Sequence, residues 1–274
     1  MLELFRTVLV LSLLGFGMTA VLLLLKPVTA KRLPAKWQYY AWVAVLLVML
    51  VPIYKLIPRS EAQRLPIFSQ PAAEERQAGT AAQDTDTVVI EGAPFEYREI
   101  PIGAERRIRL PELIAYIWLF GAVLFLTVVT ASYIVYLRRR RKSAVLLDGF
   151  ALFEDVKREL NVKRRIKIRM SPDVGSPLLV GVFLPVVYIP CREIPDENMR
   201  MVLLHELTHY RRKDLLIKWL SIFVNAVHWF NPLAYLLCAN VGQACEVSCD
   251  MEVTKSMSDA EQKLYMKTIL DLAE

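Results

Sequence analysis

Residues 197–214, ENMRMVLLHELTHYRRKD, decide the fold of this chain, and their centre is His205-Glu206-Leu207-Thr208-His209. On a helix, residues four positions apart lie on one face, so the imidazoles of His205 and His209 can reach one metal ion. Glu206 is offset by one residue and lies beside that ion, where its carboxylate can accept a proton from a bound water. The motif therefore predicts a helix that holds a hydrolytic zinc (Zn2+) site.

The alternative interpretation of this stretch is an ordinary amphipathic helix with surface histidines. The chain has only 3 His, so a chance match to H-E-x-x-H is rare. The segment is also apolar just before the motif and basic just after it, which disfavours a uniformly solvated helix.

A catalytic zinc takes three protein ligands and keeps one open position, so a third ligand must come from elsewhere. Glu246 is the candidate, and Asp250 follows it by one helical turn. An Asp in that place can hydrogen-bond a ligand histidine and orient it. The pattern E-x-x-x-D is common by itself, so this prediction depends on the upstream motif.

The apolar segment between the two motifs must reverse direction for them to meet. A single straight crossing of a bilayer would place His209 and Glu246 roughly 30 Å apart. Asn231-Pro232 supplies a helix N-cap and a first helical residue, so one helix ends just before this pair and another begins. We expect a helical hairpin over residues 214–250, either embedded in the membrane or lying against it.

The composition indicates a membrane protein. Hydrophobic residues make up 55% of the 274 residues, while Gly, Pro and Cys are too few for collagen, a disordered chain or a disulfide scaffold. Three apolar runs reach the length of about 20 residues that spans a bilayer; they are 7–25, 39–57 and 113–137. A cleaved signal peptide is disfavoured for the first run, because Lys26-Pro27 stands where small residues should be.

The charges of the loops set the orientation. The loop after the first run is basic and carries no acid, whereas residues 58–112 carry 7 Arg and 10 Asp+Glu. The third run is followed by RRRRK at 138–142. The positive-inside rule then places the N-terminus outside and the chain from Arg138 onwards in the cytoplasm. A nucleic-acid patch is the alternative for RRRRK, but its place directly after an apolar run favours a stop-transfer anchor, so we expect no direct nucleic-acid partner.

The expected fold class is a predominantly α-helical multi-pass membrane protein with a small cytoplasmic α+β metalloprotease domain. The expected segments are two transmembrane helices in 1–57, an extracytoplasmic loop in 58–112, a third transmembrane helix in 113–137, and the protease domain in 138–274 with the hairpin 214–250. Within the loop, 60–87 is typical of a flexible linker and 88–100 of a short strand pair. Within the protease domain we expect a helix at 150–160 and strands at 165–170, 178–182 and 186–189.

Three further residues leave alternatives open. His228 lies near the hairpin tip, where a helix-capping role is favoured over a catalytic one. Cys245 and Cys249 are four residues apart and could bind metal, but small buried side chains are the favoured interpretation. All 4 Cys fall in the membrane or on the cytoplasmic side, where thiols stay reduced, so we expect no disulfides.

The motifs together resemble the membrane zinc metallopeptidases of the BlaR/MecR antirepressor type. The resemblance rests on HELTHYRRKD (205–214), HWFNP (228–232), ACEVSCD (244–250) and SPLLVGVFLPVVYIP (176–190). It implies a gluzincin-like domain related to the CAAX-prenyl endopeptidases.

By residue, the resemblance implies that His205, His209 and Glu246 bind zinc and that Glu206 is the general base. In that family a penicillin-binding sensor follows the protease. This chain ends at Glu274 and contains no S-x-x-K, so we expect either a sensorless member or a truncated receptor.

The leading hypothesis is zinc-dependent peptide hydrolysis on the cytoplasmic side. The resemblance implies a cytosolic transcriptional repressor as the substrate, or the chain itself, and a homodimer is left open. A strand within 178–189 is the candidate for holding the substrate as an added strand.

Three other functions are weighed against this one. A site-2-type intramembrane protease is disfavoured because Leu233-Ala234 follow Asn231-Pro232 where an N-P-D-G-like motif is needed. A CAAX-type endopeptidase needs more spans. A non-catalytic receptor or scaffold with a structural zinc has no need for Glu206.

Overall fold

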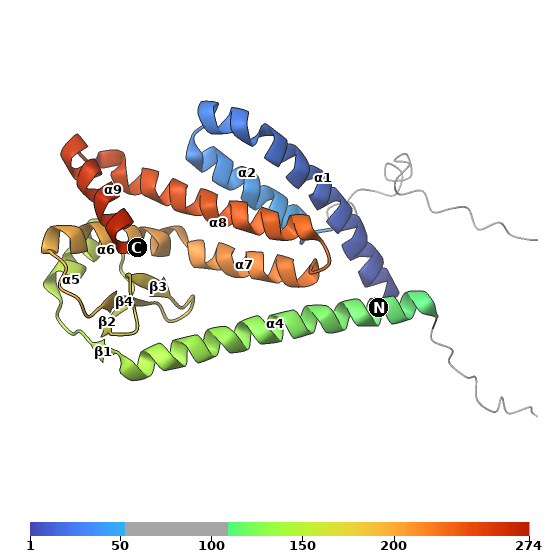
Figure 1. Ribbon diagram of the computed structural model, residues 1–274, viewed down its shortest axis with the longest axis horizontal. Coiled ribbons are helices and arrows are strands. Elements are labelled where there is room, and N and C mark those ends of the chain that lie inside the picture. The colour runs from blue at the N-terminus through green and yellow to red at the C-terminus, as the bar shows by residue number, and fades with distance from the viewer. Residues whose placement is uncertain (53–108, 274) are drawn as a thin grey trace, which may run out of the picture.

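The computed structural model describes residues 1–52 and 109–273, so the predicted linker at 60–87 and strand pair at 88–100 lie outside the described residues. The described chain is mostly helical and carries a small sheet at one end. Five helices pack along one another (Figure 1). They are α1 (Leu2–Arg32), α2 (Ala35–Val48), α4 (Leu110–Ser143), α7 (Asp214–Val227) and α8 (Pro232–Val253).

Two of the described helices are long and apolar enough to cross a membrane. They are the Leu2–Thr29 part of α1 and the whole of α4, and both contain the runs that the sequence predicts. Most of their side chains are exposed, which suits contact with lipid better than the core of a soluble protein. The second predicted run, 39–57, overlaps α2 only over residues 39–48, and α2 has 14 residues, so it is not one of these two helices. α2 begins earlier than the run and ends at Val48 with a turn ahead of Pro52, because a proline disfavours helix in the residue before it.

The sheet has the order β1-β2-β4-β3. Its strands are β1 (Val145–Leu146), β2 (Lys167–Ser171), β3 (Leu178–Val180) and β4 (Val186–Pro190). β2 and β4 are parallel, and β3 pairs with β4 antiparallel at one edge. The expected strands at 165–170, 178–182 and 186–189 are therefore confirmed, each within two residues at both ends.

Helices cover one face of this sheet and form its core. They are α5 (Ala151–Glu159), α6 (Asp196–Arg212) and α9 (Asp259–Ala273), with the short helix η2 (Thr254–Ser256) between α8 and α9. Phe153 of α5, Val187 of β4 and Leu203 of α6 are fully buried members of one cluster. Burial of such apolar side chains supplies most of the stability of this end of the molecule.

The tip of the α7–α8 hairpin is fixed to the first two helices. Asn231 caps α8 by accepting a hydrogen bond from Leu233 N at 3.0 Å, and its amide donates to Ser12 Oγ of α1 at 2.8 Å. His228 is fully buried, and its Nε2 donates to the carbonyl of Met49 at 3.0 Å. His228 stands at the C-terminal end of α7 as expected, but its side chain bonds the end of α2 and does not cap its own helix.

Two tryptophans join α4 to the hairpin tip, each through a hydrogen bond from its indole N–H to a backbone carbonyl. Trp118 Nε1 donates to Val227 O at 2.8 Å, and Trp229 Nε1 donates to Trp118 O at 3.2 Å. One turn further along α4, a Cβ placed on Gly121 would lie 2.6 Å from the ring of Trp229. Glycine is therefore required at position 121 for the indole to lie against α4.

We predict that Gly121→Ala lowers the apparent melting temperature of the purified chain in detergent. The added methyl group overpacks the contact with Trp229, which typically costs about 1–3 kcal/mol. The matched control is Gly17→Ala on α1, where a Cβ meets nothing within 4 Å. There the better helix propensity of Ala raises stability by up to about 1 kcal/mol. A Gly121→Ala protein that melts no lower than the Gly17→Ala protein would contradict the packing described above.

Candidate metal centre

Three side chains from two helices converge on one point. His205 Nε2 and His209 Nε2 are 3.1 Å apart, and Glu246 Oε2 lies 3.1 Å from His209 Nε2 and 3.6 Å from His205 Nε2. Ligands of a tetrahedral zinc at 2.0–2.1 Å are separated by about 3.3 Å. The three residues that the sequence singles out are therefore spaced as zinc ligands are.

The local folds of α6 and α8 produce this convergence. α6 carries acidic residues in its first turn, which favour its start, and presents both histidines on one face. It ends at Lys213, whose left-handed backbone (φ 61°) turns the chain into α7. α8 then returns beside α7 and α6 and brings Glu246 to the histidine pair.

The other nitrogen of each ring is held by side chains of the surrounding helices, of which Asp214 and Tyr265 are buried. His209 Nδ1 donates to Asp214 Oδ2 at 2.7 Å, and Asp214 is fully buried. His205 Nδ1 lies 2.7 Å from Tyr265 Oη and 3.2 Å from Asp250 Oδ1, and the Tyr265 hydroxyl donates to that same carboxylate oxygen at 2.7 Å. Acceptors at Nδ1 place the proton there and leave each Nε2 lone pair directed at the common point.

Asp250 lies beside His205, where the sequence predicts it, but sequence reasoning missed two partners. Asp214 falls at the end of the decisive stretch, where its place depends on the left-handed break at Lys213. Tyr265 lies on α9 and reaches the site only through the packing of α9 on α6. The signal for Asp214 was its nearness to the motif, whereas no spacing rule points to Tyr265.

Lys218 of α7 sets the orientation of Glu246. Its Nζ lies 3.0 Å from Glu246 Oε1, so Oε2 is the oxygen that faces the histidines. Burial disfavours the charged form of His205, but hydrogen bonds to Asp250 and Glu246 outweigh this and raise the pKa of the imidazole to about 10. The carboxylates around the rings thus create a site that favours positive charge, as a divalent cation requires.

Glu206 lies beside the pair and next to the edge strand. Burial raises the pKa of its carboxyl group, while the two histidines and a hydrogen bond from the backbone of Leu179 in β3 lower it. The net effect is a carboxylate with a raised pKa, and such a group accepts a proton more readily at neutral pH.

Two cysteines also lie close to the histidines. Cys249 Sγ lies 3.7 Å from the carbonyl oxygen of His205, and Cys245 is grouped with His209 and Asp214 within 4.8 Å. Both thiols are buried and free of disulfides. Because the Cys249 thiol donates to the helix backbone, it occupies the inner side of α6, and Glu246 remains the closest carboxylate to both Nε2 atoms.

A cavity of about 310 Å³ opens beside His209. Val182 of the β3–β4 turn and Leu216 of α7 contribute apolar walls, and Lys163 and Arg211 contribute charge. The cavity therefore joins the histidine helix to the edge of the sheet.

The sequence also matches known proteins. Residues 6–274 match the family model described as BlaR1 peptidase M56. Regulatory protein BlaR1 of Bacillus licheniformis is 30% identical over 156 residues, which cover 55% of this chain and 25% of that protein. Methicillin resistance mecR1 protein of Staphylococcus aureus is 25% identical over 169 residues, which cover 58% of this chain and 28% of that protein.

The chain thus spans about a quarter of the length of these two relatives. The match to the family model covers nearly all of this chain. The resemblance that the sequence motifs suggest is confirmed: this chain belongs to the BlaR1 peptidase M56 family.

Proposed function

We propose that the chain is a membrane-bound zinc metalloendopeptidase that cleaves a cytosolic protein, or its own chain, on the cytoplasmic side. The observation that carries the proposal is the meeting of His205, His209 and Glu246, with Glu206 beside them. Membership of a peptidase family supports it. The end of the molecule that carries the sheet and α6 is then a gluzincin-like domain.

The ligands and the base have separate roles in this proposal. His205, His209 and Glu246 would hold a zinc ion, which would supply a water of lowered pKa and polarise the scissile carbonyl. Glu206 lies where its carboxylate would accept a proton and pass it to the leaving amine. Asp214, Asp250 and Tyr265 keep the imidazoles in the orientation that binding needs.

The edge of the sheet is suited to hold the substrate. β3 is an edge strand of the described sheet, and it packs against α6 next to Glu206. An extended peptide added along β3 would run past the proposed zinc site. The cavity beside His209 would then receive one of its side chains.

The helices fit the predicted placement in the membrane. α1 and α4 run in the same direction (Figure 1), as required if the N-terminus and residue 110 both lie outside. The metal centre lies at the end of the bundle where α4 reaches its basic residues, and the hairpin tip lies at the other end. This arrangement supports an active site on the cytoplasmic side, and α2 and the hairpin complete the multi-pass bundle.

A regulatory substrate is inferred from the relatives. BlaR1 is described as a regulatory protein, and a signalling peptidase of this kind would act on a transcriptional repressor.

We predict that Glu206→Gln abolishes cleavage but leaves zinc bound. Removing a general base typically costs about 10²- to 10⁴-fold in rate, while the metal ligands are untouched. The measurement is mass spectrometry of new peptide N-termini in bacteria that carry the full chain, together with zinc analysis of the purified protein. Glu197→Gln, in the exposed first turn of the same helix, is the matched control and should behave as wild type.

The same experiment separates the peptidase from its main rival. New termini that depend on Glu206 identify the substrate, whether repressor or self. Zinc-loaded protein that yields the same termini with Gln at position 206 would instead support a scaffold with a structural zinc.

We predict that Asp214→Asn weakens zinc binding by about 10- to 100-fold, the usual effect of losing a partner of a ligand histidine. The amide keeps the size of the carboxylate but loses its charge beside His209 Nδ1. Zinc retention is measured against a chelator series, with helix content by circular dichroism as the check on folding. Asp259→Asn, at the exposed start of α9, should not change retention. An unchanged affinity in a folded Asp214→Asn protein would refute the supporting role of this carboxylate.

A further inference from the structure

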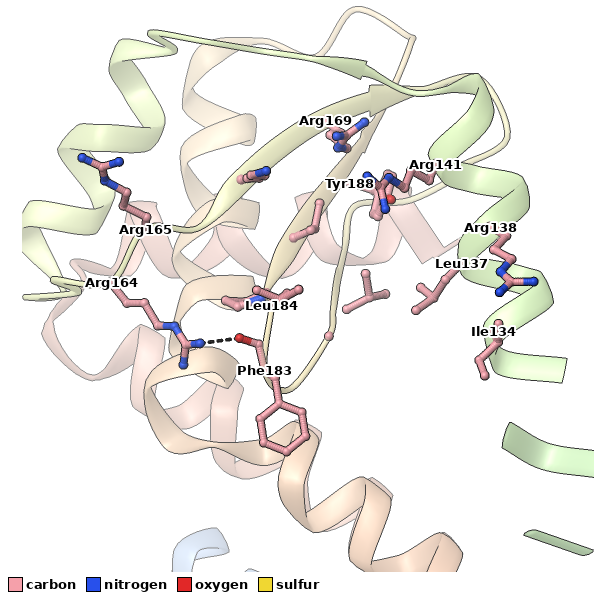
Figure 2. A pocket seen from close by; sticks show the side chains of 15 residues that line it. Ile134, Leu137, Arg138, Arg141, Arg164, Arg165, Arg169, Phe183, Leu184 and Tyr188 are labelled. Carbon is pink, nitrogen blue, oxygen red and sulfur yellow. Dashed lines mark hydrogen bonds between the residues drawn. The ribbon is translucent and has the colours of Figure 1, made fainter. Parts of the chain in front are cut away.

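The turn between β3 and β4 exposes two large apolar side chains. Phe183 is 82% exposed and Leu184 is 83% exposed, the highest values among the large hydrophobic side chains of the described chain. In Figure 2 the ring of Phe183 projects away from the sheet. Leaving two such neighbouring side chains in water is unfavourable, so a contact with an apolar phase is expected.

The turn is held rigidly rather than left loose. Gly181 has a φ of 85°, and its N–H donates to the Tyr133 hydroxyl of α4 at 3.2 Å. Arg164 donates to the carbonyl oxygen of Phe183 from the other side (Figure 2). The two apolar side chains are therefore presented in a fixed position beside α4.

The same turn borders a hollow of about 390 Å³ with a cationic rim, which we call the basic hollow. Its apolar wall includes Ile134 and Leu137 of α4. Its cations are Arg138, Arg141, Arg164, Arg165, Lys167 and Arg169. Within the described residues no carboxylate lines the hollow, and none of these six cations is ion-paired.

Strand alternation explains how the cations gather there. Ile166 and Ile168 point into the core, so Lys167 and Arg169 of β2 lie on the opposite face of the sheet, toward α4. Like charges gathered without acids repel one another. An anionic partner that enters the hollow relieves this repulsion.

The hollow also lies where the apolar part of α4 ends. Ile134 and Leu137 belong to the apolar run of this helix, and Arg138 begins its basic run. In the proposed placement this is the level of the inner headgroups, where cations and anionic phosphates meet. The tip formed by Phe183 and Leu184 lies on the same side of the sheet as this boundary (Figure 2).

We infer that the basic hollow binds an anionic phospholipid of the inner leaflet. Its phosphate lies among the cations of β2, Arg164 and α4, and its acyl chain lies against Ile134 and Leu137. Phe183 and Leu184 enter the hydrocarbon beside it and tie the sheet to the membrane surface. The inference rests on the membrane placement in the proposed function, but it does not require peptidase activity.

A lipid fits these features better than an acidic peptide does. A peptide could neutralise the cations, but it would leave the apolar tip and the apolar wall of α4 to the solvent. A phospholipid carries both an anionic headgroup and an apolar chain, in the order that the hollow presents them.

The first test uses the full chain, purified in detergent, with added phosphatidylglycerol or phosphatidylcholine and native mass spectrometry as the readout. Wild type should retain phosphatidylglycerol in preference. The double variant Lys167→Gln/Arg169→Gln, which removes both cations of β2 from the hollow, should bind it about 25-fold more weakly, because each cation near an anionic headgroup contributes a factor of about five. Lys263→Gln/Lys267→Gln on α9 removes two exposed cations elsewhere and should leave retention unchanged.

The second test measures depth by tryptophan quenching in vesicles of brominated lipid. Phe183→Trp should add a quenched signal, whereas Met266→Trp, on an exposed site of α9, should not. Equal quenching of the two variants would overturn the insertion of the tip.

The remaining outcomes are also decisive. Unchanged phosphatidylglycerol retention in Lys167→Gln/Arg169→Gln would overturn the proposed site. Complete displacement of the lipid by inorganic phosphate would show that the headgroup charge alone is bound. If the double variant lost binding to a poly-glutamate peptide that wild type binds, but retained the lipid as wild type does, the hollow would be assigned to an acidic peptide. Glu206→Gln should bind lipid as wild type does, so failure of the peptidase proposal would be visible separately.

Discussion

The contact between Glu246 and the two histidines is the constraint on which the rest of the structure depends. Two ligands on one helix can be supplied by spacing alone, but the third must return from a segment that first leads away from the site. The chain meets this requirement with a bend at Lys213, after which α7 leads away from the site, and a reversal at the hairpin tip (Figure 1). The capping of α8 by Asn231 and the bond from His228 to the end of α2 fix that tip, and so fix where Glu246 arrives.

Charge at the metal centre is balanced by groups from several helices. Asp214, Glu246 and Asp250 surround the two rings. Lys218 pairs with Glu246 Oε1, the oxygen turned away from the histidines, and Arg212 Nε lies 3.2 Å from Asp214 Oδ2, the oxygen that also accepts from His209. Such a cluster in a partly buried place is costly unless each charge has a partner. A divalent cation between the Nε2 atoms and Glu246 would complete the pairing, since it takes the place of protons that the imidazoles otherwise hold.

The sequence predicted what periodicity and capping determine. The two histidines follow from helical spacing, and the return of Glu246 follows from the helix boundary at Asn231-Pro232. The alternation at 165–170 predicted β2. What it did not reveal depends on tertiary packing: Tyr265 arrives from a helix with no motif of its own, and Lys218 meets Glu246 only because α7 and α8 lie side by side. α2 ends at Val48 ahead of Pro52, a boundary that the apolar run 39–57 does not mark because hydropathy does not register the backbone restriction that a proline imposes.

The metal centre and the helix bundle are one packed unit rather than a domain attached to an anchor. Tyr39 of α2 donates to Asp214 Oδ1 at 3.1 Å, and the Arg212 guanidinium lies 5.1 Å from the centroid of the Tyr39 ring. Asp214 in turn holds His209, so one buried carboxylate connects a ligand to a helix of the bundle. Lys36 adds an ion pair from the start of α2 to Glu252 at the end of α8. Since hydrogen-bond geometry at Nδ1 governs the orientation of the ring, the packing of α2 helps to orient His209 in the proposed zinc site.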